Sequence, residues 1–72
     1  MKIKETTQPA ITMYNGRFCA ELENGEFILS DGSMHLVRCV KVPEGMKVVE
    51  SGIIGGMMMR NIDDFRWCVE HL

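Results

Sequence analysis

Three dipeptides that favour tight turns constrain this chain more than any other feature of its 72 residues. Each pairs Asn or Asp with Gly, and each separates short runs in which apolar and polar residues alternate. Such dipeptides favour two-residue hairpin turns, because both central residues of a type I′ turn need a positive φ. Short strands joined by regularly spaced turns predict an antiparallel β-meander. The dipeptides are Asn15-Gly16, Asn24-Gly25 and Asp31-Gly32.

Two-residue turns also predict the register of the strands. Residues opposed across such a turn share one face of the sheet, and side chains alternate between the faces along each strand. The predicted pairs are Ile11 with Ala20, Met13 with Phe18, Leu22 with Phe27, Ala20 with Leu29, Leu29 with Met34, and Phe27 with Leu36. All three turns thereby place large apolar residues on one continuous face, and Ile28 points away from it.

The fourth connection is Pro43-Glu44-Gly45, whose final glycine suits a type I turn followed by a left-handed residue. This turn opposes Arg38 with Glu50, so the one charge on the apolar face has an acidic partner. The remaining pairs predicted here are Val42 with Met46, Val40 with Val48, and Leu36 with Gly52.

The C-terminal residues have the pattern of an amphipathic helix. Asn61 is a suitable N-cap, and two aspartates follow it in the first turn, where carboxylates favour the helix dipole. Apolar residues recur at spacings of three and four and predict the buried side: Ile62, Phe65, Val69 and Leu72. Trp67 then lies nearly opposite them, on the exposed side of the helix.

The sequence therefore predicts an α+β fold, a five-stranded antiparallel β-meander with one C-terminal α-helix packed on its apolar face. A small curled β-barrel with a terminal helix is the alternative. The expected strands are 10–14, 17–22, 26–30, 33–42 and 46–54, and the expected helix is 61–71. We expect residues 1–72 to form a single domain, because a chain this short supports one core.

Composition excludes several classes of protein. Apolar residues make up 46% of the chain and the net charge is only −2, which is typical of a folded domain rather than a disordered one. The basic residues are not clustered, so we expect no nucleic-acid binding. No apolar run approaches the roughly 20 residues of a membrane span, and no secretory signal opens the chain. We expect a cytoplasmic protein that does not bind membranes.

The cysteines and histidines give no catalytic or metal-binding pattern. Three cysteines without paired spacing argue for reduced thiols and against a disulfide framework. Cys19 and His35 fall on strands separated by a third strand, about 10 Å apart, which is too far for a nucleophile and its base. We therefore expect no enzyme, no cofactor and no metal. A small metal- or ligand-binding protein that uses His35, or Cys68 with His71, is the alternative function.

Protein binding is the function that the sequence favours. An outward Trp is unusual on a small helix and is typical of binding hot spots, and neighbouring methionines adapt to varied surfaces. The second face of the sheet combines an apolar centre with a polar rim, as protein interfaces do. We expect an interaction module that acts as an accessory or inhibitor protein, forming a homodimer. Its expected contact residues are Trp67, Met57, Met58, Met59, Tyr14, Arg17, Ile28 and Val37.

Overall fold

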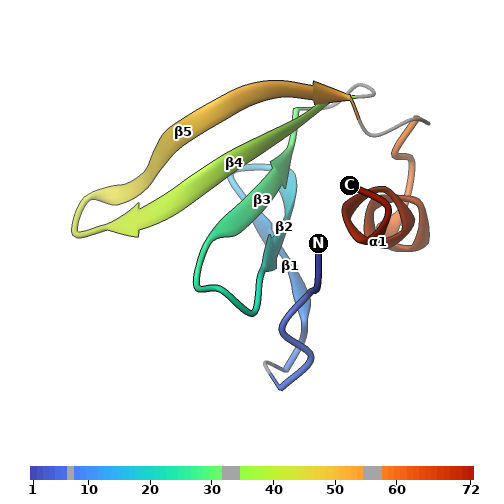
Figure 1. Ribbon diagram of the computed structural model, residues 1–72, viewed down its shortest axis with the longest axis horizontal. Coiled ribbons are helices and arrows are strands. Elements are labelled where there is room, and N and C mark those ends of the chain that lie inside the picture. Colours follow the sequence, from blue (N-terminus) through green and yellow to red (C-terminus); the bar gives the residue numbers. More distant parts are fainter. Residues whose placement is uncertain (7, 32–34, 55–57) are drawn as a thin grey trace.

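The protein folds into one five-stranded antiparallel sheet followed by one helix (Figure 1). The computed structural model describes residues 1–6, 8–31, 35–54 and 58–72. Strands follow one another across the sheet in chain order, so the predicted α+β meander is confirmed. The sheet does not close, and the alternative barrel is wrong. The elements are β1 (Ile11–Tyr14), β2 (Arg17–Glu21), β3 (Phe27–Ser30), β4 (His35–Val42), β5 (Gly45–Ile54) and α1 (Ile62–Glu70).

The first hairpin has the predicted register. Asn15 and Gly16 both adopt positive φ angles, 50° and 77°, as a type I′ turn requires. Ile11 faces Ala20, and Met13 faces Phe18. Here the local turn chemistry was sufficient to fix the pairing of β1 with β2.

The second hairpin differs from the prediction by one residue. Asn24 keeps a negative φ and uses its side-chain Oδ1 to accept a hydrogen bond from the Glu26 backbone N–H at 2.9 Å. Only Gly25 of the pair is left-handed, with φ 89°, and Leu22 bonds to Glu26 across a three-residue loop. Ala20 therefore faces Ile28 rather than Leu29. A one-residue slip exchanges the faces of a strand, so Ile28 points into the core.

The third connection is longer than the predicted two-residue turn. Ser30 faces Leu36, and the Asp31 N–H donates to the His35 carbonyl at 3.3 Å. Phe27 consequently faces Cys39, and the predicted pairing of Phe27 with Leu36 is wrong. The predicted partner of Leu29 was Met34, which lies outside the described residues; Leu29 faces Val37.

The fourth hairpin keeps the predicted pair of Arg38 and Glu50 but changes its neighbours. Val42 faces Gly45 and Cys39 faces Val48, so the predicted pairs on that side of Arg38 are wrong by one residue. The register shifts by one residue on each side of Arg38, so the predicted alignment holds at the Arg38–Glu50 pair. On the other side of that pair, Leu36 faces Ile53. β5 is therefore bulged at two places, and one of its extra residues is Val49.

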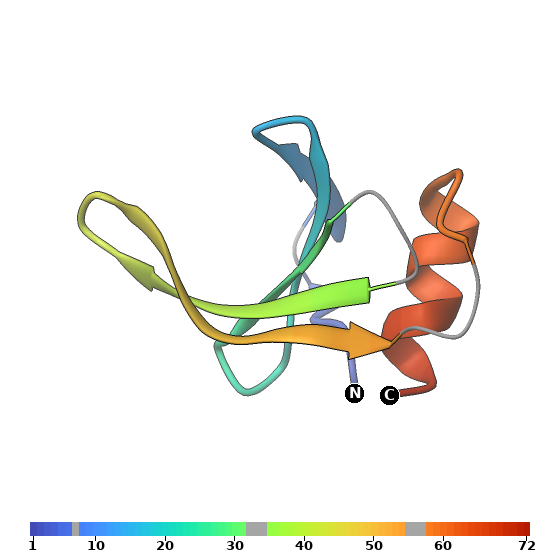
Figure 2. The same cartoon turned by 90° about the horizontal axis from the view of Figure 1, so that it is seen from above.

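Two apolar clusters lie on the two faces of the sheet. The main core lies under α1, which packs near one end of the sheet (Figure 2). The β1–β2 hairpin stands at a steep angle to the β4–β5 hairpin, and the second cluster lies on the opposite face. The buried core residues are Ile3, Ile11, Ala20, Leu22, Ile28, Leu36, Met59, Phe65, Cys68 and Val69, and the second cluster buries Cys19, Leu29, Val37 and Cys39.

The N-terminal segment joins the sheet to the helix, which the sequence did not predict. Ile3 forms a bridge with Leu22 and is 3% exposed. The Lys4 N–H donates to the Glu21 carbonyl at 2.8 Å, and the Met1 nitrogen donates to the Val69 carbonyl at 3.1 Å. The segment thus covers the core between the end of β2 and the end of α1.

Candidate protein-binding surface

Helix α1 begins as predicted but buries a different set of side chains. Asn61 is the N-cap, and its Oδ1 accepts from the Asp64 N–H at 2.9 Å. Phe65, Cys68 and Val69 are buried against the sheet. Ile62 and Leu72, which were predicted to be buried, are 48% and 37% exposed. Ile62 at the start of α1 and Leu72 beyond its end therefore stay partly in solvent.

Trp67 lies on the exposed side of α1, where the spacing predicted it. At about 100° per residue, it is almost opposite the buried trio of Phe65, Cys68 and Val69. Its side chain retains 46% of its accessible surface.

A stacked imidazole holds the Trp67 ring in place. The ring centroids of Trp67 and His71 are 4.0 Å apart, and the two planes differ by 14°. His71 Nδ1 lies 2.8 Å from the Trp67 carbonyl oxygen, and because a carbonyl only accepts, the proton is on Nδ1. The indole is therefore an exposed apolar surface whose orientation is restricted by the stack with His71. Less side-chain entropy is then lost when a partner binds.

Acidic groups surround this indole on the helix. Asp63 lies one turn before Trp67 and Glu70 lies almost one turn after it, and both are exposed. Arg66, the nearest basic residue, is engaged in ion pairs with Glu5 and Glu70. A partner that covers Trp67 meets negative charge at the rim of the contact.

The predicted methionine surface is divided between the core and solvent. Met59 is 8% exposed and belongs to the main core, so it offers almost no surface to a partner. Met58 is 61% exposed and precedes the first turn of α1, whereas Trp67 lies in the second half of the helix. Met57 lies outside the described residues. Of this run, the structure leaves Met58 available as a contact residue.

The predicted contact residues on the sheet also separate. Ile28 is fully buried in the main core, so its expected outward position is wrong. Val37 is 6% exposed inside the second cluster, and Tyr14 packs partly against that cluster. Tyr14 Oη approaches Gly45 so closely that a Cβ there would lie 2.8 Å away. Arg17 alone of these four is exposed, and the face is a packed cluster more than an open surface.

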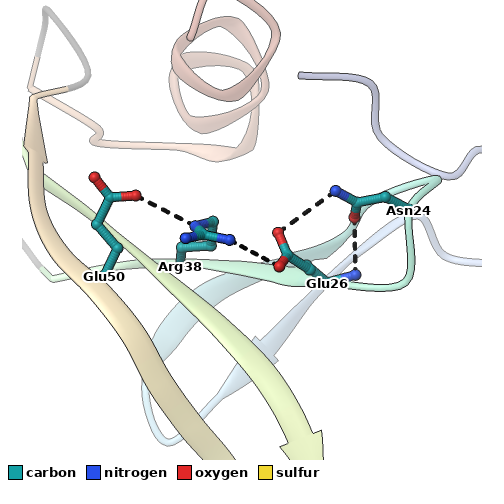
Figure 3. Close-up of polar contacts among 4 residues, drawn as sticks. All are labelled: Asn24, Glu26, Arg38 and Glu50. Carbon is teal, nitrogen blue, oxygen red and sulfur yellow. Dashed lines mark hydrogen bonds and ion pairs between the residues drawn. The ribbon is translucent and has the colours of Figure 1, made fainter.

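A polar network crosses the sheet where Arg38 interrupts the apolar pattern (Figure 3). Arg38 Nη1 donates to Glu26 at 2.7 Å, and its Nε donates to Glu50 at 3.3 Å. The hydrogen bond to Glu26 is the main cause that raises the pKa of Arg38 above its ordinary value. Asn24 in turn bonds to Glu26. The network pairs the Arg38 charge, which lies on the same face of the sheet as Ile28. Ile28 of β3 is directly opposed to Arg38.

The thiols and imidazoles do not assemble a metal site among the described residues. The three cysteines are buried and free of disulfides, as predicted. Burial is the largest cause that raises the pKa of Cys19 and of Cys39. Cys68 is fully buried while His71 stacks on Trp67, so the two residues of the alternative metal pair face different environments.

A depression lies beside the N-terminal segment. It has a volume of about 450 Å³ and is lined by Met1, Lys2, Ile3, Glu5, Glu23 and Glu70. Its ionisable lining residues are one lysine and three glutamates, and its lining includes neither Trp67 nor a thiol or imidazole.

These features define a small α+β domain with an open meander and an exposed, stacked Trp on its helix. Comparison with protein-family models, with curated proteins and with solved structures finds no match to this chain. Within the part of the chain that the structure describes, no helix has the length and apolarity needed to cross a membrane.

Proposed function

We propose that this protein is a small cytoplasmic interaction module that binds another protein through Trp67 and acts as an accessory or inhibitor protein. The exposed indole carries the proposal, since Trp is among the residues most enriched at binding hot spots and this side chain is 46% exposed. The ordered stack with His71 supports the same role.

The charges around Trp67 indicate the kind of partner. Asp63 and Glu70 favour a protein whose apolar pocket is rimmed by Lys or Arg, because complementary charge steers association and selects partners. Met58 adds a second exposed contact toward the start of α1. The module also acts as a homodimer in this proposal.

The Trp67→Ala variant tests the proposal, with Met13→Ala as the matched control. Met13 is 59% exposed and lies on β1 rather than on α1, so its loss removes an exposed apolar group from a different element. Proteins captured by the wild type are identified, and their affinity for each purified variant is measured by titration. Trp67→Ala is expected to weaken binding by about thirtyfold or more while the unfolding midpoint stays near that of the wild type.

Two results would contradict this function. One is a partner that binds Trp67→Ala as tightly as the wild type. The other is unfolding of the Trp67→Ala monomer, because that would show that the indole stabilises the fold rather than a complex.

A further inference from the structure

Strand β5 is the longest strand and forms one margin of the sheet. It runs for ten residues, pairs only with β4 among the described strands, and has no described element along its outer edge in either view (Figures 1 and 2). Val48 and Val49, at its middle, are 55% and 43% exposed. The opposite margin, β1, has four residues. An edge of unpaired N–H and C=O groups is a template for another strand.

The bulge at Val49 places two opposite charges on one face of this edge. Lys47 faces Val40, and Glu50 faces Arg38, and these two β4 residues are two apart and so share a face. In an unbulged strand, residues three apart lie on opposite faces. The extra residue Val49 brings the Lys47 and Glu50 side chains to the same side.

From this arrangement we infer that a second copy of this protein pairs with β5, antiparallel, about a two-fold axis between Val48 and Val49. Such an axis is perpendicular to the sheet and keeps each side chain on its own face of the sheet. Residues opposed across the dimer must therefore lie on the same face. Lys47 then faces Glu50 of the second copy, twice, and the exposed valines meet at the centre. Without the bulge, Lys47 and Glu50 would lie on opposite faces of the sheet and could not be opposed in this register.

The charges disfavour two other registers of this edge. A shift that centres the axis on Lys47 opposes two lysines, and one that centres it on Glu50 opposes two glutamates, which is destabilising. Lys47 makes no ion pair with the described residues. Glu50 uses Oε1 for Arg38 and keeps 54% of its side chain exposed. Bulges and charges ordinarily discourage strand addition, and here the charges favour this alignment over the two that oppose like charges.

This dimer deepens the homodimer part of the proposed function and does not depend on Trp67. Charge exchange tests it by measuring mass in solution against concentration, from micromolar to millimolar protein. Lys47→Glu places a carboxylate opposite Glu50 of the second copy, and Glu50→Lys places an ammonium group opposite Lys47. Each variant alone is expected to raise the dimer dissociation constant about tenfold or more. In a mixed dimer of the two variants both contacts pair a carboxylate with an ammonium group, so an equimolar mixture is expected to recover dimers.

Several outcomes overturn the inference. They are a wild type that stays monomeric up to millimolar concentration, single variants that dimerise as the wild type does, or a mixture that stays monomeric. Circular dichroism checks that each variant is folded. If loss of the Arg38 contact unfolds Glu50→Lys, then Lys47→Glu, which breaks no described ion pair, decides alone. Trp67→Ala is expected to leave the dimer mass unchanged, so failure of the protein-binding proposal is distinguishable from failure of this one.

Discussion

Cys19 and Cys39 behave as small apolar residues in the second cluster. Burial disfavours their thiolate forms and raises both pKa values above the ordinary thiol value of about 8.5. The unfolded chain therefore loses these protons at lower pH than the folded chain does. The stability that the buried thiols contribute is complete below the unfolded pKa and is lost as the pH rises through the folded pKa.

The free energy of unfolding is accordingly expected to fall as the pH rises from about 8 to 10. Urea denaturation at several pH values measures this fall. The double variant Cys19→Ala, Cys39→Ala lacks both thiols and keeps every other titrating group, so its fall is expected to be smaller. An equal slope in the variant and the wild type would show that the thiols do not cause the pH dependence.

At the scale of elements, β3 shows how one residue of register reverses the roles of neighbours. Ile28 is fully buried and faces Ala20, whereas Phe27 lies on the other face and is only partly buried. The three-residue loop around Asn24 and Gly25 causes this exchange. Phe27, although it has the larger side chain, therefore contributes less to the main core than Ile28 does.

Ile28→Ala is expected to destabilise the protein by about 2–5 kcal/mol, because it removes buried methyl groups and leaves a cavity. Phe27→Ala is expected to cost less, since the Phe27 ring remains partly in solvent. Unfolding by urea compares the two. A larger loss for Phe27→Ala would contradict the observed register and favour the two-residue turn.

For the molecule as a whole, the N-terminal segment closes the core between the sheet and the helix. Ile3 is nearly as buried as any strand residue, and backbone hydrogen bonds on both sides of it join the segment to Glu21 and Glu23 at the end of β2. Arg66 on α1 pairs with Glu5 of the same segment. The two ends of the described chain consequently lie close together (Figure 1).

Ile3→Ala is expected to cost about 2–4 kcal/mol of unfolding free energy, a large part of the total for a domain this small. Lys2→Ala is the matched control, because Lys2 is exposed and adjacent in sequence. Thermal and urea unfolding measure both. If Ile3→Ala matches Lys2→Ala, the segment does not stabilise the core.

Sequence alone determined the features that depend on local chemistry. Asn15 and Gly16 both tolerate positive φ, so the first turn has one favoured form. Asn61 caps α1 through its own side chain. The spacing of Phe65 and Val69 predicted that Trp67 lies on the exposed side of the helix. The fold class, the reduced thiols and the Arg38–Glu50 pair followed from the same patterns.

Tertiary structure decided the registers, and through them most of the candidate contact surface. Asn24-Gly25 suits both a two-residue and a three-residue loop, and the choice depends on whether Ile28 or Leu29 packs better under α1. Only Met1 and Ile3 are apolar in the first eight residues, which is too few for a periodicity to mark Ile3 as core. The bulge that aligns Lys47 with Glu50 arises from matching β5 to β4, since register is a property of two strands packed together and not of either sequence alone.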